Sequence, residues 1–164
     1  GMAAEGEALI ARMEAAIAEA VARHPELDGK TAMFVTHLDS TNLSVVNFYS
    51  AHDTRVKFFQ DLGLAMPASV VEATQPGQFF GSVSAERIDA FEDVDILVTY
   101  GGADLMAAMR ADPLMAHMPA VANEAVVMLK NDPMGNAANP TPLGLPYVLE
   151  DYTALLAEAA RKSR

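Results

Sequence analysis

The sequence predicts an α/β domain, a three-layer α/β/α arrangement in which helices cover both faces of a mostly parallel, open sheet. Two observations predict this class. Short apolar segments rich in β-branched and aromatic residues alternate along the chain with segments of helical period, and this alternation is typical of parallel sheets. The 164 residues also contain no internal repeat and no low-complexity linker, so we expect one compact unit with its own hydrophobic core.

The first predicted element is a long, alanine-rich helix over residues 3–23. Apolar residues recur at every fourth position and form a single stripe along it: Leu9, Met13, Ile17 and Val21. The helix is expected to end at His24, because the residue before a proline disfavours helical angles.

The remaining elements follow from the same reasoning. Apolar, β-branched segments predict strands over 31–35, 43–49, 95–100 and 125–129. Helical period and end signals predict helices over 53–62, from Ser84 onward, over 103–109 and over 145–161, with a brief helical turn at 112–113. The segments 66–77, 79–83 and 130–142 are predicted to be irregular or loops.

Composition excludes several classes of function. The chain carries 22 acidic and 11 basic residues, a formal net charge of −11, which argues against binding to a nucleic-acid backbone and against adsorption to an anionic membrane. It has no cysteine, so disulfides, thiolate catalysis and cysteine-based zinc sites are excluded. No apolar run is long enough for membrane insertion, and we expect no signal peptide in residues 1–16. Gly1 before Met2 is typical of an expression remnant.

Motifs for common catalytic and cofactor sites are missing. The sequence has no G-x-S-x-G, no P-loop and no G-x-G-x-x-G, so no catalytic residue and no cofactor is predicted. His37, Asp39 and Ser40 offer a base and a nucleophile, but neighbours in one loop rarely converge as a triad does. A small doubly wound α/β enzyme or cofactor-binding domain stays open as the alternative, on fold analogy alone.

Five segments resemble a known family in the correct order: 48–55 (FYSAHDTR), 58–64 (FFQDLGL), 83–101 (V-S-x-E through D-x-L-V-x-Y-G), 113–129 (PLMAHMPAVANEAVVML) and 139–152 (NPTPLGLPYVLEDY). They are similar to the C-terminal lobe of the class III periplasmic binding proteins of ABC importers for iron-siderophores, haem and cobalamin. The resemblance implies a linker helix over 1–24 and a C-terminal lobe over 25–164, with the N-terminal lobe absent.

The same resemblance implies a function without chemistry. It implies binding of a ferric siderophore or related metal chelate, docking to an ABC permease, and a periplasmic or otherwise extracytoplasmic location. The missing lobe would leave a face exposed, so a homodimer through that face is also a candidate.

Candidate ligand-cleft residues gather at strand ends, where ligands of open α/β sheets bind. Tyr49, His52 and Arg55 surround the end of the second strand and the start of the next helix, and Arg55 supplies charge for a ferric siderophore. Tyr100 and Gly101 end the third predicted strand. Asp53 or Thr54 is more simply explained as the helix cap.

Two further candidates come from the resemblance. It places a ligand-contacting aromatic at Phe80, and in an extended segment the adjacent Phe79 would point the opposite way, into the core. It also places a permease-docking glutamate at Glu86, which we expect to be exposed in the first turn of its helix.

The four histidines show no paired spacing, so no metal site is predicted. A site that uses His37 and His52 with a carboxylate remains a minor alternative.

Overall fold

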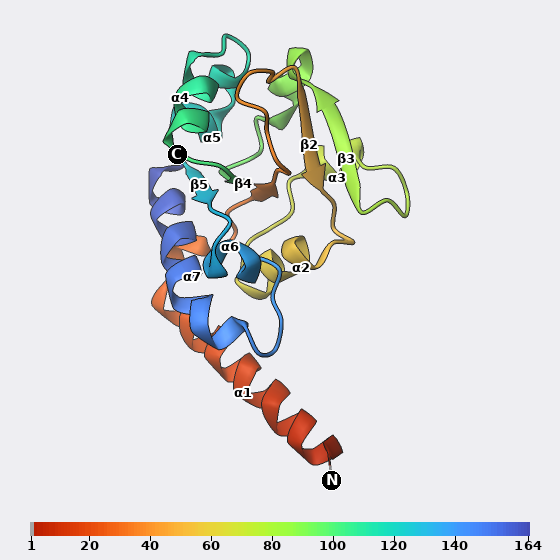
Figure 1. Cartoon of the computed structure of the whole chain (residues 1–164), viewed down its shortest axis with the longest axis vertical. Coiled ribbons are helices and arrows are strands. Elements are labelled where there is room, and N and C mark those ends of the chain that lie inside the picture. Colours follow the sequence, from red (N-terminus) through yellow and green to blue (C-terminus); the bar gives the residue numbers. More distant parts are fainter. Residues whose placement is uncertain (1) are drawn as a thin grey trace.

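The computed structural model describes residues 2–164, which form three layers with a long helix projecting from one end (Figure 1). The middle layer is a parallel sheet in the order β1-β4-β5, with bounds Ala32–Phe34, Ile96–Tyr100 and Val126–Leu129. Helices α4 (Ala103–Ala111) and α5 (Pro119–Ala122) cover one face of this sheet, and α2 (Thr54–Asp61) and α7 (Leu145–Lys162) cover the other. The predicted three-layer α/β/α class is therefore confirmed.

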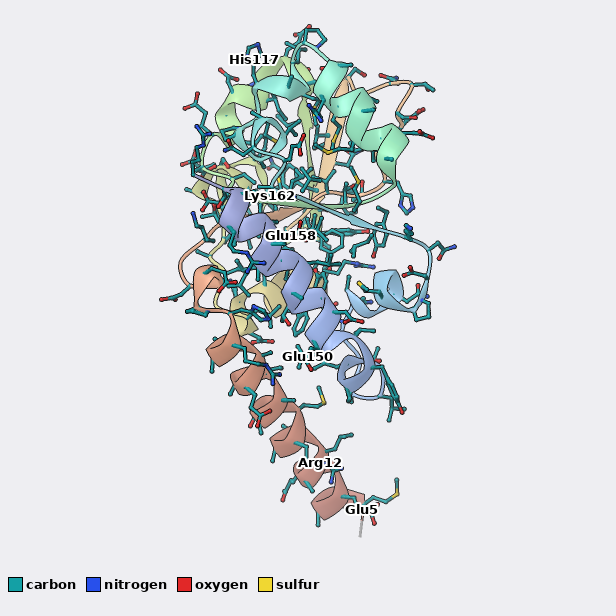
Figure 2. The ribbon with its side chains drawn as sticks, turned by 90° about the vertical axis from the view of Figure 1, so that its left-hand side faces the viewer. Glu5, Arg12, His117, Glu150, Glu158 and Lys162 are labelled. Carbon is teal, nitrogen blue, oxygen red and sulfur yellow. The ribbon has the colours of Figure 1, made fainter. Side chains whose placement is uncertain are left out.

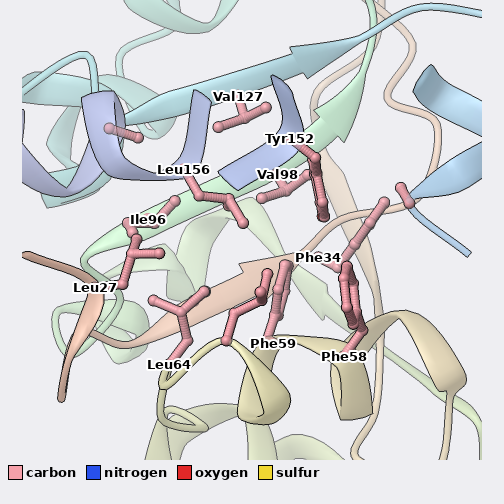
Figure 3. Packing of buried hydrophobic residues seen from close by; sticks show 14 of the residues in the cluster. Leu27, Phe34, Phe58, Phe59, Leu64, Ile96, Val98, Val127, Tyr152 and Leu156 are labelled. Atoms are coloured by element: carbon pink, nitrogen blue, oxygen red, sulfur yellow. The ribbon is translucent and has the colours of Figure 1, made fainter. Parts of the chain in front are cut away.

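Alternation along the strands builds two hydrophobic cores, one on each face of the sheet. Ala32 and Phe34 of β1 join the core under α2 and α7, whereas Met33 joins the core under α4 and α5. Figure 3 shows the first core, in which Phe34 lies among Phe58, Phe59 and Tyr152. Because both faces are covered, β1 and β4 are nearly fully buried, whereas β5 alternates between buried and partly buried residues.

The long first helix, α1 (Met2–Arg23), lies against α7 only through its C-terminal part. The predicted stripe makes this contact, since Met13, Ile17 and Val21 pack against the first core. Figure 2 shows the N-terminal part, with Glu5 and Arg12, extending beyond the rest of the molecule. In the part of the chain that the structure describes, no helix is long and apolar enough to cross a membrane.

One strand was missing from the prediction. Residues 79–83 were expected to form a loop, but β3 (Phe80–Ser84) pairs antiparallel with β2 (Val45–Tyr49) in a separate two-stranded ribbon. The reason is a partner distant in sequence, which local propensity does not report. Gly81 belongs to this packing rather than to a turn, because a Cβ there would lie 2.6 Å from the Phe48 ring.

Two helices also lie in segments expected to be irregular. They are α3 (Ala68–Ala73) and α6 (Pro133–Ala137). Asp132 caps α6 by accepting a hydrogen bond from the Gly135 N–H at 2.9 Å. The helix predicted from Ser84 is a 3₁₀ segment, η2 (Ala85–Phe91), and two more lie at η1 (Pro25–Leu27) and η3 (Met115–His117). The helical turn expected at 112–113 is observed later, at Met115–His117, and α5 was not predicted. The other predicted elements are observed with ends shifted by one or two residues.

Candidate functional site

A cleft of about 760 Å³ opens where the parallel strands β4 and β5 end. This is the position at which open α/β sheets bind ligands. Its lining combines aromatic, charged and amide side chains with two backbone glycines: His37, Leu38, Ser40, Tyr49, Arg55, Tyr100, Gly101, Gly102, Asp104, Leu105, Leu129, Lys130, Asn131 and Asn136.

Arg55 is held in this cleft by three neighbours. Asp53, the N-cap of α2, accepts from the Arg55 backbone N–H at 2.9 Å, and its two carboxylate oxygens each lie 3.0 Å from Nη1 of Arg55. The guanidinium carbon lies 4.4 Å from the centre of the Tyr49 ring. Burial lowers the pKa of Arg55, but hydrogen bonding with Tyr100 and with Asp53 outweighs that effect and raises it. The cation is therefore permanent and fixed in orientation.

Three ring side chains line the cleft, His37, Tyr49 and Tyr100, and the buried Phe34 ring packs behind them. The Phe34 ring lies 5.5 Å from the Tyr49 ring, edge to face, and 5.7 Å from the Tyr100 ring. His37 stacks on Tyr100 with ring centres 5.1 Å apart and an interplanar angle of 11°. The Tyr100 hydroxyl donates to the carbonyl of Gly135 at 3.2 Å. These contacts present rigid, flat surfaces beside the guanidinium.

Four of the six predicted cleft residues, Tyr49, Arg55, Tyr100 and Gly101, line this single cleft. At Gly101 a Cβ would lie 2.5 Å from Cδ2 of Leu105, so a larger residue would force the Leu105 side chain to move. His52 is not among the lining residues. It lies against Phe79, with ring centres 6.2 Å apart, and borders a smaller hollow beside α3.

The predicted orientation of the two adjacent phenylalanines was half wrong. Phe80 is 61% exposed as expected, but Phe79 is also 59% exposed and does not enter the core. The ribbon explains this, because Phe79 precedes the first paired residue of β3 and packs beside His52 rather than under the sheet. Phe80 is paired directly with Tyr49, so the two side chains project from the same face of the ribbon. Phe80 itself is not among the residues that line the cleft.

Glu86 is exposed, as predicted, at the start of η2. Its backbone N–H donates to the Ser84 hydroxyl at 3.4 Å, which confirms Ser84 as the N-cap. Among the ion pairs of the described residues, Arg110 pairs with Glu124 at 2.6 Å, and none of these pairs includes Glu86. The Glu86 carboxylate is thus available on the surface of the lobe.

The minor metal alternative loses its geometric basis. His37 stacks on Tyr100 at the cleft, whereas His52 lies against Phe79. Across residues 2–164 no three histidine, aspartate or glutamate side chains converge on a point that could hold a metal ion.

Sequence reasoning missed several lining residues, chiefly Lys130, Asn131 and Asn136. They lie in the segment expected to be a loop, and α6 folds back so that Asn136 reaches the cleft. A usable signal was present, because Asp132 followed by Pro133 is an N-cap with proline at the first helical position.

Comparisons with known proteins agree with this geometry. Residues 1–133 match the family model described as "Periplasmic binding protein". The chain belongs to the periplasmic binding protein family. Comparison with curated protein sequences finds no significant match.

Several solved structures share the fold. PiaA of Streptococcus pneumoniae TIGR4 in complex with ferrichrome is 33% identical with a TM-score of 0.91, over 100% of this chain and 55% of that one. A second PiaA structure, described as an iron uptake ABC transporter substrate-binding protein, is 32% identical with a TM-score of 0.88, over 99% and 56%. FhuD2 of Staphylococcus aureus with bound ferrioxamine B, at 16% identity, shares the fold with a TM-score of 0.67, over 94% and 58%. The chain thus spans about half the length of these proteins.

Proposed function

We propose that this chain is the C-terminal lobe, with its linker helix, of the substrate-binding component of an ABC importer for iron-siderophore complexes. One observation carries the proposal: the fixed guanidinium of Arg55 over Tyr49, inside an aromatic-lined cleft at the strand ends. The similarity to PiaA, which is seen with ferrichrome, supports the same ligand class. The lobe would bind and present its ligand without chemical change.

The chemistry of the cleft suits a ferric hydroxamate. Such a complex presents metal-bound oxygens that accept hydrogen bonds, and a guanidinium donates strongly to them. The charges at the cleft nearly balance. The positive charge of Arg55 is paired with Asp53, and the positive charge of Lys130 is matched by the negative charge of Asp104. A neutral complex is therefore favoured over a polyanionic one, which would need an excess of cations.

We assign Phe80 and His52 to the rim of this cleft. The pairing of Phe80 with Tyr49 continues the aromatic face of the ribbon past the cleft residues. His52 lies in the turn between Tyr49 and Arg55 and is exposed. A bound ligand that rises above the cleft would contact an exposed aromatic at this position.

We assign Glu86 to docking on the permease. Its carboxylate is exposed beside the capped end of η2 and suits pairing with an arginine of a partner. The second wall of the cleft would come from an N-terminal lobe, as expected for a chain that spans about half of its relatives.

The test is a binding screen on this chain and on a two-lobed version of the protein. The candidate ligands are ferrichrome, a ferric tricatecholate, haem, cobalamin and free divalent metals. Saturable binding of ferrichrome by the two-lobed protein, with weaker binding by this chain, is expected. Absence of siderophore binding by the two-lobed protein would contradict the proposal.

A further inference from the structure

Two buried polar atoms near the cleft lack a protein partner. Within residues 2–164, the Nε of Arg55 and the hydroxyl oxygen of Tyr152 are the buried side-chain nitrogen and oxygen atoms with no hydrogen bond. Buried N–H and O–H groups in folded proteins almost always have a partner, and an ordered water supplies it where protein atoms do not.

Both side chains pack against rings of the first core or beside it. Tyr152 comes from the middle of α7 and is 1% exposed. Its ring stacks on Phe58 with centres 6.0 Å apart and an interplanar angle of 13°. Phe58 lies three residues after Arg55 on α2, and residues at that spacing share a helix face. Figure 3 shows Tyr152 entering the core from α7 beside Phe34, whose ring also contacts Tyr49 under the guanidinium.

Electrostatics connect the two side chains. The pKa of the Tyr152 hydroxyl is raised, mainly by burial and further by Tyr100, while the positive charge of Arg55 acts in the opposite direction. The hydroxyl therefore stays protonated and serves both as donor and as acceptor.

We propose that Tyr152 is a positioning residue for Arg55: one buried water accepts the Nε–H of Arg55 and is held by the Tyr152 hydroxyl. The Asp53 carboxylate already accepts hydrogen bonds from Nη1 of Arg55. With Nη1 held by Asp53 and Nε held by the water, two of the three guanidinium nitrogens are anchored. Nη2 is left to donate to a ligand or to the Tyr100 hydroxyl. The consequence for ligand affinity rests on the proposed function, whereas the water bridge does not.

The bridge is tested without ligand by NMR of the Arg55 Nε–H group, identified as the signal that Arg55→Lys removes. In the wild-type chain this proton is expected to exchange slowly and to show a cross-peak to a bound water. Tyr152→Phe keeps the ring and removes the hydroxyl, and we expect exchange to become at least roughly 10-fold faster, because the anchored water is lost. Tyr147→Phe is the matched control, since Tyr147 lies on the same helix but is 86% exposed. An Nε–H signal that exchanges as fast in the wild type as in Tyr152→Phe would overturn the proposal.

The effect on binding is measured with the gallium(III) complex of desferrichrome, a diamagnetic stand-in for ferrichrome. Tyr152→Phe is expected to weaken its binding by roughly 3- to 10-fold, the value of one net hydrogen bond, with Tyr147→Phe unchanged. In an Arg55→Lys background the same change is expected to have no further effect on affinity, because lysine lacks the Nε–H group that donates to the water. Equal weakening in both backgrounds would overturn the positioning role. If the two-lobed protein does not bind the complex at all, the proposed function fails, and the exchange measurement on this chain still decides the bridge.

Discussion

The guanidinium carbon of Arg55 lies 4.4 Å from the centre of the Tyr49 ring, while its Nη1 contacts both carboxylate oxygens of Asp53. The three residues come from the end of β2 and the start of α2, seven positions in all, from 49 to 55. A charge is thereby placed on an aromatic surface with its orientation fixed before any ligand arrives. Preorganisation of this kind lowers the entropic cost of binding.

Arg55→Ala is expected to weaken binding of ferrichrome, or of its gallium analogue, by at least about 10-fold. The reason is the loss of a charged hydrogen-bond donor, worth about 1.5–3 kcal/mol. Titration followed by NMR or calorimetry measures the effect. Arg110→Ala is the matched control, because Arg110 pairs with Glu124 on the surface and does not line the cleft. Equal loss of affinity in both variants would contradict a specific role for Arg55.

The chain by itself is expected to bind ferrichrome only weakly. A binding site usually covers most of its ligand, and one lobe supplies one wall while the entropic cost of association remains nearly whole. Calorimetry on this chain should give a dissociation constant above roughly 1 μM. Submicromolar affinity would show that this wall suffices alone.

Phe80→Ala and Phe79→Ala are both expected to leave the free energy of unfolding nearly unchanged, because both side chains are more than half exposed. Phe58→Ala, in contrast, should cost about 3–5 kcal/mol, since it empties a buried site under Tyr152. Urea melts compare the three variants.

Ligand binding separates the two exposed rings. Only Phe80→Ala is expected to weaken binding by the two-lobed protein, because Phe80 shares a ribbon face with Tyr49 whereas Phe79 packs beside His52. Phe79→Ala is thus its matched control. The opposite order of effects would mean that Phe79 is the ring that meets the ligand.

The parts of the fold that sequence reasoning predicted are those set by local signals. Asp53 or Thr54 was expected as the helix cap, and Asp53 is the cap. The four cleft residues followed from strand ends, since β4 and the end of β2 were correctly located.

The missed parts depend on contacts between distant segments. Phe80 to Ser84 contains one glycine and two serines, so its strand propensity is low, and it becomes a strand by pairing with β2, some 35 positions away in sequence. The exposure of Phe79 depends on which residues of the two strands pair. Because pairing begins at Phe80, Phe79 lies just outside the ribbon, and the sequence alone does not give this register. The amide of Asn136 reaches the cleft because α6 folds back over the end of β5, whereas Asn131 lies there because it directly follows that strand.

Glu86→Ala is expected to leave the melting temperature and the ligand affinity unchanged, because the carboxylate is exposed and is not among the residues that line the cleft. In a two-lobed protein it should reduce siderophore uptake through its permease. Uptake of labelled ferrichrome by cells measures this, with Glu92→Ala, another exposed carboxylate that follows the same 3₁₀ segment, as the control. Full uptake by the Glu86→Ala variant would show that Glu86 does not take part in docking to the permease.

Acid is expected to weaken the contact between the end of α7 and the turn after α1. Glu26 pairs with Arg161 of α7, and His24 Nδ1 lies 3.6 Å from the same carboxylate oxygen. The pKa of Glu26 is lowered from its ordinary value of 4.5, first by a hydrogen bond from its own backbone, which burial opposes, and then by His24 and Arg161. A carboxyl whose pKa is lower in the folded state stabilises the fold above its unfolded pKa. Its contribution is therefore complete above about pH 5 and is lost as the pH falls through the folded value.

Glu26→Gln isolates this contribution. The difference in urea midpoint between the wild type and the variant should be constant near neutral pH, should shrink below pH 4.5, the ordinary pKa of the group, and should vanish in stronger acid, where the wild-type carboxyl is also protonated. Glu150→Gln is the matched control, since Glu150 of α7 pairs with Arg23 at the end of α1 at 3.2 Å but is far more exposed than Glu26, with 74% of its side chain accessible. It should shift the midpoint little at any pH, because exposed pairs contribute little. A Glu26→Gln difference that stays constant into strong acid would show that packing at this position, rather than its charge, joins α7 to the turn.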